Sequence, residues 1–191
     1  MSSGAHHHET DNSLAGKVRH NTQVHAQRCY QCGKCSAGCP LAADMDYPPS
    51  MILRMLQTGS PELEEKILRS YTIWLCLSCE MCIQRCPMEV DIPVMMDWLR
   101  QESIRQKKVN PKAKNIVSFH KSFLDSIHYT GRLFEFGLVV DYKMRSWKLL
   151  QDITLMPGMI SRGKLHFIPE RIKGIKNVSS IFSKVSKEDK K

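Results

Sequence analysis

Eight cysteines stand in two groups that share one spacing. The first group reads CYQCGKCSAGCP over residues 29–40, and the second reads CLSCEMCIQRCP over residues 76–87. In each group the second and third cysteines follow at intervals of three residues, the fourth comes four residues later, and a proline follows it. Thiols gathered this densely can form disulfides, bind structural zinc or bind an iron–sulfur cluster, and the three uses require different spacings.

The spacing favours iron and sulfide over the other two uses. Disulfides belong to oxidising compartments, and the polar N-terminus MSSGAHHHETDNSLAG has no apolar signal-peptide core. Structural zinc is typically held by two separated CxxC pairs or by mixtures of Cys and His. The run C-x2-C-x2-C-x3-C-P is instead typical of bacterial ferredoxins, so its two copies predict two [4Fe–4S] clusters.

In two-cluster ferredoxins the fourth cysteine of each run binds the other cluster. Applied here, this crossing predicts two ligand sets, Cys29, Cys32, Cys35 and Cys86 for one cluster and Cys76, Cys79, Cys82 and Cys39 for the other. Exchanged ligands would hold the clusters close enough for electrons to pass between them. Because the thiolates would repel one another without iron, we expect the apo chain to be largely unfolded.

The residues between and around the cysteines have predicted roles of their own. Gly33 and Gly38 allow unusual backbone angles that turn N–H groups toward sulfur. Apolar side chains near the second group should exclude water, namely Ile73, Trp74, Leu75, Leu77 and Ile83. Three aspartates border the groups and are expected to cap turns, namely Asp44, Asp46 and Asp91.

The rest of the chain predicts a mostly α protein. A helical face in SMILRMLQTG, formed by Met51, Ile52, Met55 and Leu56, ends at Gly59. The Ser60 hydroxyl is expected to cap a second helix that begins at Pro61 and runs to about residue 70, and Asp91 begins a third that runs to about residue 107. Further helices are expected over residues 111–129 and 132–150. The 36 residues between Cys39 and Cys76 leave room for two helices, which indicates an α-helical ferredoxin arrangement.

The predicted organisation has three parts. Residues 1–20 form a flexible tail, residues 21–108 an α-helical ferredoxin domain with two [4Fe–4S] clusters, and residues 109–191 C-terminal helices with a basic, extended arm. Beyond residue 152, Pro157, Gly158, Gly163 and Pro169 predict an irregular conformation for that arm.

Charge is divided unevenly along the chain. Residues 1–99 carry 8 Lys and Arg against 11 Asp and Glu, whereas residues 100–191 carry 20 against 8. The basic residues of the second half alternate with apolar ones, which favours docking to a protein partner over nucleic acid. No apolar run approaches the roughly 20 residues that span a bilayer, so we expect a cytoplasmic chain that reaches membranes only through partners.

Nothing in the chain predicts catalysis of its own. All eight cysteines are assigned to clusters, and neither a GxGxxG dinucleotide motif nor a P-loop is present. We therefore interpret the chain as a non-catalytic electron-transfer component of an oxidoreductase complex.

The sequence resembles the HdrC family, the iron–sulfur C subunits of heterodisulfide reductase. Beyond the two cysteine motifs, the resemblance rests on TGRLFEFGL (130–138), LMPGM (155–159), RGKLHFIPERIKGI (162–175) and SSIF (179–182), and it covers about residues 20–183. It implies a hetero-oligomer in which this chain passes electrons from a flavin-containing HdrA-like partner to an HdrB-like partner with a catalytic CCG-type cysteine-rich domain. The C-terminal arm would wrap these partners.

Two other interpretations remain open. The same cysteine motifs occur in iron–sulfur subunits of quinone-linked respiratory dehydrogenases and reductases, although this chain lacks the CxxxxCxxC motif of the succinate dehydrogenase protein. The other interpretation is an iron–sulfur protein whose basic half binds nucleic acid, and the affinity of that binding would fall steeply as the salt concentration rises.

Overall fold

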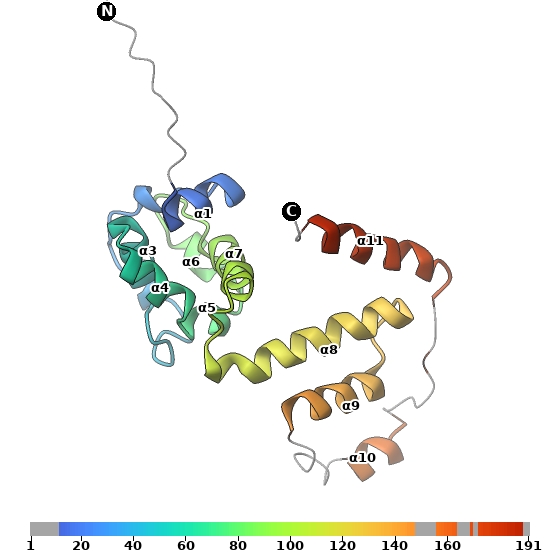
Figure 1. The fold of residues 1–191 in the computed structure, drawn as a ribbon. Helices are drawn as coiled ribbons and strands as arrows, with labels where there is room; N and C mark the ends of the chain where they lie inside the picture. The colour runs from blue at the N-terminus through green and yellow to red at the C-terminus, as the bar shows by residue number, and fades with distance from the viewer. Residues whose placement is uncertain (1–11, 148–155, 164–168, 170–171, 189–191) are drawn as a thin grey trace, which may run out of the picture. The chain divides into compact units, whose positions relative to one another are not determined.

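A computed structural model describes residues 12–147, 156–163, 169 and 172–188 (Figure 1). The chain divides into two compact units, residues 1–113 and residues 114–191. Within the described residues every regular element is a helix, which confirms the predicted mostly α fold.

Unit 1, residues 1–113, holds both cysteine motifs between short helices. Its elements are α1 (Leu14–Thr22), η1 (Ala26–Arg28), α2 (Lys34–Ala37), α3 (Pro49–Thr58), α4 (Pro61–Leu68), α5 (Thr72–Leu75), α6 (Met81–Gln84), α7 (Ile92–Arg105) and η2 (Pro111–Ala113). Each motif loop leads into one four-residue helix, α2 in the first and α6 in the second. The longer helices α3, α4 and α7 are left to build the core.

The core of unit 1 forms where α1, α4 and α5 pack on α7, and where α1 and α4 also pack on α3. Its fully buried side chains include Val18, Ile52, Leu53, Leu56, Ile67, Ile73, Ile92, Met95, Met96 and Leu99. These positions recur every three or four residues along α3 and α7, as burial of one helix face requires. Helix α3 follows the first motif and α7 follows the second. Because both helices are anchored in the core, the core also fixes the position of the chain at the end of each motif.

Most of the expected helix signals of unit 1 are confirmed. Gly59 ends α3 in the left-handed conformation (φ 65°), and the Asp91 side chain accepts a hydrogen bond from the Val94 N–H at the start of α7. Two details differ from the prediction. The Ser60 hydroxyl makes no capping hydrogen bond to α4, and Met51 of α3 is 48% exposed while Leu53 is buried.

The prediction of a flexible tail over residues 1–20 is wrong for its last part, since α1 begins at Leu14. The Ser13 hydroxyl accepts a hydrogen bond from the Gly16 N–H, and the Leu14 N–H donates to Glu64 of α4 at 2.7 Å. Leu14, Ala15 and Val18 are buried on one face, and α1 packs on α7 and α3. A helix this short is stabilised by the core it joins, so its own residues carry a weak signal. Residues 1–11 lie outside the described part of the chain.

Unit 2, residues 114–191, contains α8 (Lys114–Thr130), α9 (Glu135–Ser146), α10 (Met156–Ser161) and α11 (Ile175–Glu188). The long helix α8 packs against both α9 and α11. Phe119 of α8 meets Tyr142 of α9 edge to face, with ring centroids 5.9 Å apart, and His128 stacks on Phe182 of α11 at 4.7 Å. Arg145 of α9 adds an ion pair to Asp125 of α8 at 2.7 Å.

The irregular conformation expected beyond residue 152 is wrong where α10 and α11 form. Pro157 is the second residue of α10, a place where its missing N–H leaves no helical hydrogen bond unmade. In α11 the apolar residues Ile175, Val178, Phe182 and Val185 recur at helical spacing behind Gly174 (φ 90°). Part of the predicted helix over 132–150 and several stretches of the predicted arm lie outside the described residues.

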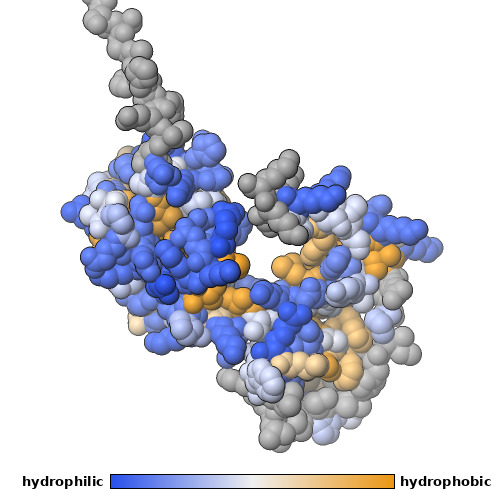
Figure 2. Space-filling view, in the orientation of Figure 1, coloured by the Kyte–Doolittle hydropathy of each residue, from blue (hydrophilic) through white to orange (hydrophobic). Residues whose placement is uncertain are grey.

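The visible face of both units is mainly hydrophilic, with separate hydrophobic areas at the surface (Figure 2). Among the helices that the structure describes, none is both long and apolar enough to cross a membrane.

Candidate metal centre

The two cysteine motifs share one backbone conformation. In the first motif Gln31 and Gly33 have positive φ angles of 64° and 75°, and in the second the corresponding Ser78 and Glu80 have 50° and 62°. Left-handed residues at these two positions give both loops the same curl between the first and third cysteines. The repeat seen in the sequence is therefore a repeat of structure, down to individual dihedral angles.

The prediction of unusual backbone angles is confirmed for Gly33 and wrong for Gly38, whose φ is −101°. Gly38 instead meets a limit of space, because a Cβ added there would lie 2.5 Å from the Arg85 side chain. Gly38 and Arg85 directly precede the fourth cysteines of the two motifs, and α2 and α6 pack together. The backbones that carry Cys39 and Cys86 thus come close to each other.

The shared loop conformation predicts opposite effects at Gly33 and Glu80. A Cβ at Gly33 would meet no atom within 4 Å, so Gly33→Ala should cost only backbone strain, about 1 kcal/mol of unfolding free energy. Glu80→Gly relieves the same strain but adds freedom to the unfolded chain, and should leave the protein equally stable or up to about 1 kcal/mol more stable. Chemical denaturation of the cluster-loaded variants measures both, and a loss of stability in both would contradict the strain argument.

A recess beside the second motif brings Cys39 of the first motif together with Cys76, Cys79 and Cys82. Its walls are largely apolar and include the buried side chains Met45, Ile92 and Met96. Four thiols in an apolar recess fit the donor set of a [4Fe–4S] cluster. The ligand set predicted for the second cluster is the set that lines this recess.

The first motif has a corresponding neighbour in Cys86. The pKa of Tyr30, in the first motif loop, is raised by its hydrogen bond to Cys32, then by burial, and then by the negative charges of nearby thiolates. Those thiolates include Cys86 as well as Cys29. The charge of Cys86, in the second motif, is thus one of the causes that raise the pKa of a residue in the first motif loop.

Backbone N–H groups donate hydrogen bonds to cysteine sulfur atoms in both motifs. The Gln31 N–H donates to Cys29 Sγ, and the Val90 N–H donates to Cys86 Sγ, each at 3.4 Å. The Lys34 N–H is the main cause of the lowered pKa of Cys32. Donors placed in this way stabilise thiolate charge without adding a charged side chain.

Burial opposes ionisation of several cysteines when no metal is bound. It is the main cause that raises the pKa of Cys82 to about 11, with the charge of Cys76 adding to it. Burial also raises the pKa values of Cys35 and Cys76. Metal binding must therefore displace protons from these thiols. Without the metal, ionised cysteines at these buried positions would destabilise the folded state.

The apolar shell expected around the second motif forms only in part. Ile73 and Trp74 are buried, but Leu77 is 68% exposed although it lines the recess. Cys32 and Cys79, the second cysteines of the two motifs, are also exposed. Each motif thus has one side toward the core and one toward solvent, and no disulfide joins any of the eight cysteines.

Two long side chains hold the motif loops, and neither was expected from the sequence. Gln57 of α3 donates from Nε2 to the carbonyl oxygens of Ala26 and Cys29, at 3.0 and 2.6 Å. Cys29 is the first cysteine of its motif, and Ala26 stands three residues before it. The partners are 31 and 28 residues from Gln57, so no local pattern points to them.

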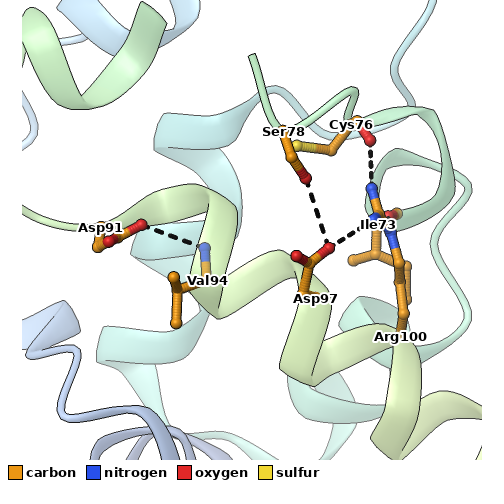
Figure 3. A network of polar contacts seen from close by, with 7 residues as sticks. All are labelled: Ile73, Cys76, Ser78, Asp91, Val94, Asp97 and Arg100. Atoms are coloured by element: carbon orange, nitrogen blue, oxygen red, sulfur yellow. Dashed lines mark hydrogen bonds and ion pairs between the residues drawn. The ribbon is translucent and has the colours of Figure 1, made fainter. Parts of the chain in front are cut away.

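Arg100 of α7 plays the same part for the second motif (Figure 3). Its guanidinium donates to the carbonyl oxygens of Ile73 and Cys76, which again are the first cysteine and the residue three before it. It also pairs with Asp97 at 2.5 Å, and Asp97 accepts a hydrogen bond from Ser78 at 3.5 Å. The two motifs therefore rest on equivalent contacts from two different helices.

Asp46 anchors the chain between the motifs, as its predicted capping role requires. Its carboxylate accepts the backbone N–H groups of Tyr71 and Thr72 at 2.7 and 2.8 Å, at the start of α5. It also accepts the Thr72 hydroxyl at 2.5 Å. Because α5 leads directly into Cys76, this contact ties the segment after the first motif to the start of the second.

Asp46→Asn should lower the unfolding free energy at neutral pH by about 1 kcal/mol, because the carboxylate is partly exposed and hydrated. Burial acts to raise the pKa of Asp46, but the hydrogen bonds from Thr72, Tyr71 and Tyr47 outweigh it and lower the pKa. A lowered folded-state pKa means that this stability is present above the unfolded value of about 3.9 and is lost as pH falls through the folded value.

Denaturation of the parent and Asp46→Asn at neutral pH and at stepwise lower pH, within the range where cluster absorbance persists, measures this dependence. The difference should shrink toward acid. Asp44→Asn serves as the control, because it removes an exposed carboxylate two residues away that, contrary to its predicted capping role, accepts no hydrogen bond from the described residues. An equal loss in both variants would contradict the capping role.

Comparison with known proteins agrees with this geometry. Residues 25–90 match a family model described as a 4Fe-4S dicluster domain. The match spans both cysteine motifs and the helices between them. It confirms the predicted cofactor, two [4Fe–4S] clusters bound by the cysteines.

Several curated proteins are similar to part of the chain. The chain is 28% identical over 109 residues to the C subunit of the H(2):CoB-CoM heterodisulfide,ferredoxin reductase of Methanothermobacter marburgensis, covering 57% of each chain. It is 36% identical over 107 residues to the second iron–sulfur C subunit of the CoB–CoM heterodisulfide reductase of Methanocaldococcus jannaschii, covering 56% of this chain and 55% of that one.

A third relative matches over a shorter stretch. The iron–sulfur C subunit of the CoB–CoM heterodisulfide reductase of Methanopyrus kandleri is 39% identical over 66 residues, 35% of this chain and 33% of that one. The chain thus spans between a third and somewhat over half of the length of these relatives.

Proposed function

We propose that this chain, an iron–sulfur protein of the HdrC family of heterodisulfide reductase components, relays electrons between two partner proteins. The bound [4Fe–4S] clusters supply one-electron chemistry, and the chain supplies their positions and surroundings. The proposal is carried by one observation, the recess in which Cys39 of the first motif joins the first three cysteines of the second.

The crossed ligand sets are part of the proposal. We assign Cys29, Cys32, Cys35 and Cys86 to the first cluster and Cys76, Cys79, Cys82 and Cys39 to the second. The recess supports the second set, and the packing of α2 on α6, beside Cys39 and Cys86, supports the first. With the fourth ligands exchanged, Cys39 and Cys86 each tie one loop to the other cluster, and α2 and α6 hold them side by side. This keeps the transfer distance short without any mobile part.

The surroundings of the motifs suit a relay. The buried side chains of Met45, Ile92 and Met96 keep water from one side of the second motif recess. Fixed N–H donors and held loops limit reorganisation when charge changes. On their other side both motifs reach the surface through Cys32 and Cys79, which gives an electron one exposed motif by which to arrive and another by which to leave.

The partners that we propose are a flavin-containing HdrA-like protein and an HdrB-like protein with a CCG-type cysteine-rich domain. In each transfer the flavoprotein is oxidised by one electron and the CCG-domain protein is reduced by one, so that this chain is unchanged after each passage. Two such passages deliver the electron pair that reduction of a disulfide requires. We place the chain in the cytoplasm, with the basic residues of its second half available for docking to partners.

Anaerobic affinity purification of the tagged chain from its own cells tests the assembly. A flavoprotein and a CCG-domain protein should accompany it in fixed ratio. Recovery of the chain only as a free monomer would overturn the complex, and recovery only in detergent with a membrane anchor would favour the quinone-linked dehydrogenase instead. Reduced preparations should show two magnetically interacting [4Fe–4S] spins by electron paramagnetic resonance (EPR).

A further inference from the structure

The two motif loops are held by equivalent contacts but by groups of different charge. Gln57, which grips the carbonyls at the first motif, is a neutral amide. Arg100, which grips the same two carbonyls of the second motif, carries a permanent positive charge. The two loops have closely similar backbone dihedral angles. The supporting side chain is neutral at the first loop and positively charged at the second, so the two motifs differ in local electrostatic potential more than in geometry.

The charge of Arg100 is poorly screened by solvent. Its side chain is only 16% exposed, and it lies against the backbone of Cys76, a proposed ligand of the second cluster. Its ion-pair partner Asp97 is 51% exposed, so water shields the negative member of the pair more than the positive one. Around Cys76 the pair therefore leaves a net positive field.

We propose that Arg100 raises the reduction potential of the cluster held by the second motif, and so biases an electron shared by the two clusters toward that motif. A cluster that accepts an electron gains one negative charge, and a neighbouring cation that is largely shielded from water stabilises this gain more than a fully hydrated one would. Gln57 offers the first motif no such stabilisation. The inference rests on the proposed function, because it takes the crossed ligand sets as its premise.

A redox titration of the full, cluster-loaded chain, followed by EPR, measures the two midpoint potentials. Arg100→Gln gives the second motif a neutral amide donor like that of the first. It should move one midpoint potential to a more negative value and leave the other unchanged. Arg100→Lys keeps the charge but loses the forked contact, and should restore part of the shift. Asp97→Asn removes the opposing charge and should move the same midpoint to a more positive value.

The matched control is Arg69→Gln, which removes an arginine that is 58% exposed and paired with Glu65 at the end of α4. It should leave both midpoints unchanged. The inference is overturned if Arg100→Gln retains both clusters with unchanged midpoints, if Asp97→Asn moves its midpoint in the same direction as Arg100→Gln, or if Arg69→Gln has an equal effect.

Loss of clusters in Arg100→Gln would not end the test. Arg100→Lys and Asp97→Asn preserve the fold contacts of the loop more closely, and an unshifted midpoint in Asp97→Asn would then overturn the inference. Failure of the proposed function has separate signatures, because the parent chain would then be recovered only as a free monomer, or Cys39→Ser would perturb the same cluster as Cys32→Ser.

Discussion

Removing iron with a chelator is expected to unfold most of unit 1. The two motifs interrupt the chain before α3 and before α7, the two helices that contribute most of the largest fully buried side chains. Without metal their loops keep non-glycine residues in left-handed conformations at Gln31, Ser78 and Glu80, each at a cost of roughly 1–2 kcal/mol. The total approaches the roughly 5–15 kcal/mol by which a whole domain is stable.

Far-UV circular dichroism during anaerobic chelation, with cluster absorbance recorded in parallel, measures the effect. Helical signal and absorbance should fall together, and both should return when iron and sulfide are restored. Chelator added to a preparation already saturated with iron controls for direct effects of the reagent. A chain that keeps its full helical signal and a cooperative melting transition after all iron has gone would contradict the prediction.

The helices that could be predicted are those whose own residues mark their ends. Gly59 ends α3 and Asp91 begins α7 where the sequence indicates, because a left-handed glycine and a capping carboxylate act locally. Helix α1 escapes prediction because its stability comes from burial of Val18 against distant helices. Helix α10 escapes it because Pro157 and Gly158 look like breakers unless the proline is known to fall in a first turn.

The same division between local and distant causes applies to the metal centre. Cysteine spacing is sufficient to predict the cofactor, since three cysteines of each motif come from one short loop. The supports of those loops could not be predicted. Gln57 and Arg100 reach their carbonyls across 24 to 31 residues, and each is an ordinary polar residue within its own helix. Only the folded chain reveals that they hold equivalent atoms.

Exchanging single cysteines for serine should reveal the crossed ligand sets. Cys39→Ser is expected to perturb the same EPR signal as Cys79→Ser, although Cys39 belongs to the first motif in sequence. Cys86→Ser should likewise group with Cys32→Ser. The physical reason is the recess, in which Cys39 lies with Cys76, Cys79 and Cys82. Each variant should lose or alter one cluster, and complete loss of that cluster would remove half of the iron.

The grouping of spectra decides the matter even where iron content does not. Serine keeps an oxygen at the ligand position, so a retained cluster would still show changed EPR parameters that identify it. Cys32→Ser and Cys79→Ser are matched references, because both replace an exposed second cysteine of a motif. If Cys39→Ser gave the spectrum of Cys32→Ser, each motif would bind its own cluster, and the close approach of α2 and α6 would be a matter of packing alone. The crossed result would mean that neither motif can complete its cluster without the other, so that loading of the two sites is coupled through Cys39 and Cys86.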